Sequence, residues 1–158
     1  TGALGHGLPI GVGMAIALKI KKINSKVVVI IGDGELNEGS NWEAALSASK
    51  HKLDNLIVII DYNKLQSYGQ TREVLDLEPL ADKCKSFGFS VFEADGHDIQ
   101  DIKCKLISKK TNIYKPKIII CHTVKGKGFP FAEHNPHWHH KSKLAKVDLD
   151  LMYECLEN

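Results

Sequence analysis

Four short apolar runs recur along the chain. Residues 27–31 (VVVII) and 56–60 (LIVII) contain no polar residue, and residues 89–93 (FSVFE) and 117–121 (KIIIC) are largely apolar. Continuous apolar runs of this length are typical of strands in a parallel sheet that is covered on both faces. We therefore predict four strands in one sheet.

Helical patterns separate these runs. Ser40 and Glu43 have the spacing of a capping box, which predicts a helix beginning after the first run. Its expected apolar face, at helical spacing, contains Trp42, Ala45, Leu46, Ser49 and Leu53.

Further helices are predicted between the later runs and at the end of the chain. Pro79 suits the first turn of a helix that stops near Gly88, and residues 98–111 and 142–156 carry helical patterns. Alternating strands and helices favour an α/β fold, an open doubly wound parallel sheet with helices on both faces.

Polar clusters follow the first two predicted strands. Gly-Asp-Gly (32–34) follows one, and Asp-Tyr-Asn (61–63) follows the other. Ligands of open α/β sheets bind outside the carboxyl ends of the strands, so Asp33 and Asn63 are expected to face one crevice. Carboxylate, amide and backbone carbonyl oxygens favour Mg²⁺ or Ca²⁺ over zinc. The glycines beside Asp33 would let the backbone approach a phosphate closely.

Composition narrows the possible functions. A chain of 158 residues with 43% hydrophobic content is predicted to form a single domain, residues 1–158. A formal charge of +2, with scattered lysines, gives no basic stripe for nucleic acid. Four widely spaced cysteines suggest neither a zinc site nor a redox motif and favour a reduced, intracellular setting. No apolar run approaches the ~20 residues that cross a bilayer, and no signal peptide is visible, so a cytoplasmic location without membrane contact is expected.

Single motifs remain ambiguous on their own. Gly-Asp-Gly after a strand is often only a turn, and so is Asp-Tyr-Asn. The glycine-rich stretch 1–19 (TGALGHGLPIGVGMAIALK) leads into a helix rich in small residues, and its loop could offer N–H groups to a phosphate or a ring. It lacks the Gly-x-Gly-x-x-Gly spacing of a dinucleotide site.

Taken together, the motifs are specific. The chain contains Gly-Asp-Gly (32–34), then 28 further residues (35–62), then Asn63. This pattern resembles the thiamine-diphosphate and magnesium motif of thiamine-dependent enzymes. Four segments resemble, in order, the N-terminal diphosphate-binding domain of transketolase. They are TGALGHGLPIGVGMAIA, GDGELNEGSNWEAALSASKHKLDNLIVIIDYNKLQ, ADGHD and TVKGKGFPFAEHNPHWHHK. The resemblance covers nearly the whole chain, and it is nearest to split transketolases whose halves are separate subunits.

The resemblance implies a cofactor, thiamine diphosphate, and a metal ion, Mg²⁺ or alternatively Ca²⁺. Asp33 and Asn63 would bind the metal through side chains and Leu65 through its carbonyl. Gly32 and Gly34 would lie beside the diphosphate. The resemblance further assigns two residues near the aminopyrimidine ring, Gly2 and Leu4.

Other roles are also implied by the resemblance. His139, the histidine after Trp138, would reach the diphosphate and the substrate. Glu38 would lie near a subunit interface and act in a proton relay. From the residues alone, a metal site in HNPHWHHK is disfavoured, because the segment lacks Cys or carboxylate partners at ligand spacing. His137 and His140 are interpreted as surface residues.

One further histidine lies before a predicted helix. His97 is expected to cap or brace that helix together with Asp98.

The implied reaction is transfer of a two-carbon ketol unit from a ketose phosphate to an aldose phosphate, as in the pentose phosphate pathway. Compared with the family, the usual N-terminal segment and the pyrimidine-binding domain, with its activating glutamate, are absent from this sequence. A partner is therefore expected, either a pyrimidine-binding-domain chain or a C-terminal transketolase subunit, in a homo- or hetero-oligomer, and the isolated chain is expected to be inactive. The alternatives are a deoxyxylulose-phosphate synthase, a dehydrogenase E1 component, and a non-catalytic degenerate subunit.

Overall fold

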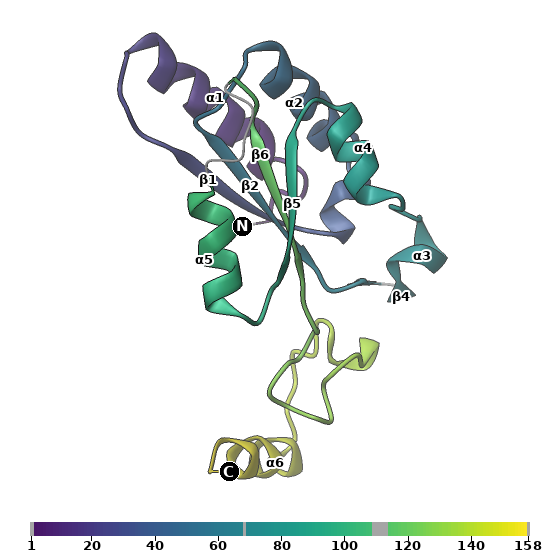
Figure 1. The fold of residues 1–158 in the computed structure, drawn as a ribbon. Helices are drawn as coiled ribbons and strands as arrows, with labels where there is room; N and C mark the ends of the chain where they lie inside the picture. The colour runs from purple at the N-terminus through teal and green to yellow at the C-terminus, as the bar shows by residue number, and fades with distance from the viewer. Residues whose placement is uncertain (1, 68, 109–113, 158) are drawn as a thin grey trace.

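The computed structural model describes residues 2–67, 69–108 and 114–157. Four parallel strands form its main sheet, in the spatial order β1-β2-β6-β5 (Figure 1). Their bounds are Val27–Gly32 for β1, Leu56–Tyr62 for β2, Ser90–Asp95 for β5 and Lys117–His122 for β6. All four predicted strands are present, with ends that differ by at most two residues from those expected.

Helices cover both faces of the sheet, as predicted. The helices α1 (Gly7–Ile20), α2 (Gly39–Lys50) and α4 (Leu80–Ser86) share a core with one face, whereas α5 (Ile99–Ile107) packs on the other. The remaining elements are short or peripheral: η1 Gly34–Asn37, β3 Leu65–Gln66, β4 Gly69–Gln70, α3 Thr71–Val74, η2 Pro136–Trp138 and α6 Lys146–Glu157. In Figure 1, α6 lies below the sheet and apart from it.

The strand register brings the carboxyl ends of three strands to one edge. Gly32 of β1 is paired with Asp61 of β2, and Asp61 is paired with Cys121 of β6. The loops that follow β1, β2 and β6 therefore begin side by side, which places distant parts of the sequence around one crevice.

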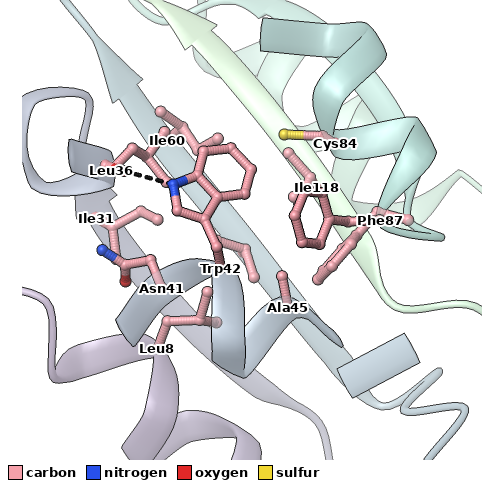
Figure 2. A pocket seen from close by; sticks show the side chains of 12 residues that line it. Leu8, Ile31, Leu36, Asn41, Trp42, Ala45, Ile60, Cys84, Phe87 and Ile118 are labelled. Carbon is pink, nitrogen blue, oxygen red and sulfur yellow. Dashed lines mark hydrogen bonds between the residues drawn. The ribbon is translucent and has the colours of Figure 1, made fainter. Parts of the chain in front are cut away.

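The larger core lies between α1, α2, α4 and the sheet (Figure 2). Trp42 of α2 points into it, its ring centroid 5.0 Å from that of Phe87, while its Nε1 donates to the Leu36 carbonyl at 2.8 Å. The void among these side chains is only about 10 Å³ and its lining is mostly apolar, so it is a packing gap with no room for a ligand.

One strand is covered less than its sequence predicts. Val28 is 51% exposed and Ile30 is 71% exposed, although the run VVVII suggested burial on both faces. The reason is that β1 lies at one edge of the sheet. The helix on that face, α5, packs on β5 and β6 at the opposite edge and does not cover β1.

The capping box predicted at the start of α2, from Ser40 and Glu43, is not formed. The helix begins at Gly39 with Glu38 as N-cap residue, and no side chain caps it. The Ser40 hydroxyl donates instead to the Gly5 carbonyl at 2.7 Å. The buried face also differs, because Leu46 is 60% exposed and small residues pack inward: Asn41, Ala44, Ala45 and Ala48.

The other helix ends are close to expectation. Pro79 precedes α4 instead of lying within its first turn, and Gly88 follows the helix with a φ of +90°. Asp98 caps α5 by accepting from the amides of Gln100 and Asp101. That helix ends at Ile107, and residues 109–111 of its predicted range lie outside the described residues. Among the helices of the described ranges, none is long and apolar enough to span a bilayer.

Two glycines of α1 provide a matched test of packing. A Cβ on Gly11 would overlap Cγ2 of Val29, whereas a Cβ on Gly13 would meet nothing within 4 Å. We expect Gly11→Ala to lower the free energy of unfolding by about 1–3 kcal/mol, because the β-branched valine has few alternative rotamers. Gly13→Ala is expected to raise it by up to about 1 kcal/mol through helix propensity. Urea denaturation of both variants checks this, and equal effects would contradict the close packing of α1 on β1.

Candidate functional site

A cavity of about 400 Å³ opens at the carboxyl ends of β1 and β2. Its walls come from the loop before α1, the turn after β1, the segment after β2 and the loop between β6 and α6. The lining residues are Leu4, Gly32, Asp33, Gly34, Glu35, Asp61, Asn63, Leu65, Gln66, Ser67, Lys125, His139 and His140.

Asp33 lies at the base of this cavity. It is the N-cap residue of η1, it is 1% exposed, and its carboxylate accepts from the backbone amides of Gly34 (2.7 Å) and Lys64. Burial raises the pKa of the Asp33 carboxyl above its ordinary value, and the nearby Asp61 carboxylate adds to this rise. A buried carboxylate beside a second one is an unfavourable arrangement that a cation would relieve.

Asn63 and Leu65 supply neighbouring oxygen atoms. Both are buried, and Asn63 Oδ1 accepts from the Leu65 amide at 3.0 Å. Together with Asp33 they form a set of carboxylate, amide and carbonyl donors, which fits a hard divalent cation. No cluster of three or more His, Cys, Asp or Glu side chains that could hold a metal is found in the described ranges, and this donor set is not of that type.

Gly34 allows the turn after β1 to pack closely against the segment after β2. A Cβ at this position would lie 2.8 Å from the Cβ of Gln66. The absence of a side chain thus lets two walls of the cavity meet.

Lys125 brings a positive charge into the cavity and was not singled out from the sequence. It lies in the segment TVKGKG, and its charge lowers the pKa of Asp33, opposing the effect of burial. Asp61 was noted only as part of a polar cluster, yet it also lines the cavity and accepts from the Thr123 hydroxyl. Its position at the carboxyl end of a strand was the signal that could have identified it.

His139 lines the cavity near Lys125. Its Nδ1 is buried and makes no hydrogen bond within the described part of the chain. Burial lowers the pKa of His139, and Lys125 and His140 lower it further, so the neutral form of the ring is favoured. A neutral imidazole can donate to a phosphate oxygen from one nitrogen.

The two neighbouring histidines differ from each other. His140 is exposed, as interpreted from the sequence, but it also lines the cavity, with Nε2 3.1 Å from Ser67 Oγ and its ring centroid 4.2 Å from that of His139. His137 is exposed and does not line the cavity. Both are surface residues, as interpreted from the sequence, and only His140 joins His139 in the lining of the cavity.

Two predicted site residues do not line the cavity. Gly2 is exposed, with a φ of +75°, and a Cβ added there would meet nothing within 4 Å. Glu38 is exposed at the start of α2. By contrast Leu4, from the same loop as Gly2, is 61% exposed and does line it.

His97 acts on a different element from the one expected. Its Nε2 accepts from the Val124 amide at 2.8 Å, so it holds the loop after β6, and Asp98 alone caps α5.

The fold and this site define a parallel α/β domain with an oxygen-donor cluster and basic residues at the carboxyl ends of its strands. Comparison with known families gives the more particular assignment. The family model of the transketolase thiamine diphosphate binding domain matches residues 1–156, and the chain belongs to this family.

Relatives support the same assignment. The chain is 52% identical over 152 residues to one subunit of the apulose-4-phosphate transketolase of Actinobacillus succinogenes, covering 96% of this chain and 55% of that protein. It is 44% identical to the 6-deoxy-6-sulfo-D-fructose transketolase subunit SqwG of a Clostridium species, covering 98% of this chain and 53% of that protein. The crystal structure of transketolase from Campylobacter jejuni superposes with a TM-score of 0.86 at 33% identity, covering 99% of this chain and 25% of the other. The chain thus spans about half the length of the curated subunits it matches.

Proposed function

We propose that this chain is the cofactor-binding part of a transketolase-type enzyme and transfers a two-carbon ketol unit from a ketose phosphate to an aldose phosphate together with a partner. The observation that carries the proposal is the cavity itself. It places Asp33, Asn63 and Leu65 at its base and Lys125 and His139 in its wall. Membership of a thiamine-diphosphate-binding family supports thiamine diphosphate as the ligand of this cavity.

The base of the cavity is proposed to hold Mg²⁺, with Ca²⁺ as a substitute. Asp33 and Asn63 would bind the ion through side-chain oxygens and Leu65 through its carbonyl. The raised pKa of Asp33 supports this role, because the unfavourable burial of its charge is what a cation offsets.

The walls are proposed to hold the organic cofactor. Gly32 leaves room for the diphosphate and Gly34 would pack beside it. Lys125 and His139 would face its charge, and Gly2 and Leu4 would meet the aminopyrimidine. When bound, thiamine diphosphate supplies the carbanion chemistry of ketol transfer. The residues of this chain would bind it, orient it and bring His139 near the substrate.

A partner is proposed for the open side of the cavity. Leu4 is largely exposed there, and two relatives of this chain are named as subunits of a transketolase. A pyrimidine-binding domain, on a separate chain or a C-terminal transketolase subunit, would cover this side and supply the carboxylate that activates the cofactor. Glu38, exposed at the start of α2, is assigned to that interface and its proton relay.

The metal assignment is tested by Asp33→Asn. The change removes a buried charge with little change in volume, so the variant is expected to stay folded while its Mg²⁺-dependent affinity for thiamine diphosphate falls by roughly tenfold or more. Isothermal titration calorimetry with and without Mg²⁺ measures this, and circular dichroism checks the fold. Unchanged affinity would contradict the assignment of Asp33 as a metal ligand.

The role of His139 is tested against a matched histidine. In the enzyme reconstituted with its partner, His139→Ala is expected to lower turnover by about tenfold or more, because a hydrogen bond to a charged phosphate is lost. His137→Ala, at an exposed position outside the cavity, is expected to change turnover by less than about twofold. Steady-state kinetics decide between them, and equal effects would instead indicate a general structural role for the loop.

The need for a partner is tested with the purified chain. Supplied with Mg²⁺, thiamine diphosphate, a ketose phosphate and an aldose phosphate, it is expected to give no two-carbon transfer, because the activating carboxylate must reach the ring nitrogen from another domain. Adding a pyrimidine-domain subunit is expected to restore transfer. Product analysis by mass spectrometry distinguishes ketol transfer from other thiamine-dependent reactions. Robust transfer by the isolated chain would overturn the shared-site proposal, and cofactor binding without transfer in any mixture would favour a non-catalytic role.

A further inference from the structure

The backbone of Gly5 makes hydrogen bonds with two side chains, one from the turn after β1 and one from the start of α2. Its N–H donates to Glu35 Oε1 at 2.9 Å, and its carbonyl accepts from the Ser40 hydroxyl at 2.7 Å. The other carboxylate oxygen of Glu35 accepts from the Gly32 amide at 3.4 Å. One carboxylate therefore joins the loop before α1 to the end of β1. We call Glu35 and Ser40 the Gly5 clamp.

The clamp is built on a fixed base. Asn41, which is 1% exposed, donates from Nδ2 to the Glu35 carbonyl at 2.6 Å, and Trp42 donates from Nε1 to the Leu36 carbonyl at 2.8 Å. Figure 2 shows the hydrogen bond from Trp42 to Leu36, and the side chains of Asn41 and Trp42 lie in the core beside it. Because η1 is held by these two side chains of α2, Glu35 has little freedom to move away from Gly5.

Gly5 fits the clamp only as glycine. Its φ is +77°, and a Cβ there would lie 2.6 Å from Glu38 Cβ and 2.7 Å from Ser40 Oγ. The close approach therefore requires the absence of a side chain, and it leaves the adjacent Leu4 at the mouth of the cavity.

We propose that Glu35 and Ser40 are positioning residues that fix the loop 2–6 relative to Asp33, and so set the spacing between the ring-binding and diphosphate-binding parts of the site. This inference rests on the function proposed above. A loop that is ordered before binding does not have to be ordered by the ligand, which favours affinity. The clamp acts mainly on the ring-binding part, because Asp33 and Asn63 are held by separate backbone hydrogen bonds. Its bond to the diphosphate-binding part, from the Gly32 amide to Glu35, is longer at 3.4 Å than its bond from the Gly5 amide at 2.9 Å.

Two probes separate these parts of the site: thiamine diphosphate with Mg²⁺, and inorganic pyrophosphate with Mg²⁺, which lacks the rings. The variants are Glu35→Asp, which keeps the charge on a side chain shorter by one methylene, and Ser40→Ala. In both, we expect the Kd for thiamine diphosphate to rise about tenfold and the Kd for pyrophosphate to change by less than about twofold. Isothermal titration calorimetry measures both constants.

Glu43→Gln is the matched control, since Glu43 is exposed on α2 and away from the cavity. It is expected to bind both probes like the wild-type chain. A general structural role for the clamp would weaken both probes equally, and that result, or no change in either, would overturn the inference. A wild-type chain that fails to bind thiamine diphosphate would overturn the proposed function as well, whereas wild-type binding with unaffected variants overturns the clamp alone.

Discussion

The buried carboxylate of Asp33 is the constraint on which the site depends. It lies at the end of β1 and is held by backbone amides of Gly34 and Lys64, so it connects the turn after β1 to the segment after β2. Burial raises its pKa, and Asp61 nearby opposes its ionisation further. A core built only for stability would place an apolar residue here. The local electrostatics instead favour the binding of a cation, and the proposed function includes one at this position.

Sheet topology turns this local feature into a cavity. Since β1, β2 and β6 are neighbours and parallel, their following loops leave the sheet at one edge. The third loop brings Lys125 and His139 to the carboxylates from a distant part of the chain. No local interaction could assemble this set, so the site depends on the register of the three strands, and that register depends on their apolar packing.

The sequence predicted most of the fold and part of the site, for physical reasons. Apolar runs identified the strands because strand burial is local in sequence, and the spacing from Asp33 to Asn63 reflects one crossover between neighbouring strands. The exposure of Ile30 was missed because an edge strand and a central strand can have the same composition. Ser40 was interpreted as a cap, but its hydroxyl has a tertiary partner in Gly5. Lys125 and His140 lie on a loop without periodicity, whose path only the structure gives.

The cavity is lined by side chains of both charge signs, and this bears on what can bind. The negative charges of Asp33 and Asp61 lie where β1 and β2 end, whereas the positive charge of Lys125 comes from the loop after β6. A free anion would meet the carboxylates and a free cation would meet Lys125, so each alone is opposed by one half of the site. In the proposed function, a cation bound to a diphosphate would present both signs together, with Asp33 and Asp61 as partners of the ion and Lys125 as a partner of the phosphate charge. The arrangement therefore favours the pair over either component, which explains in physical terms why cofactor affinity is expected to depend on the metal.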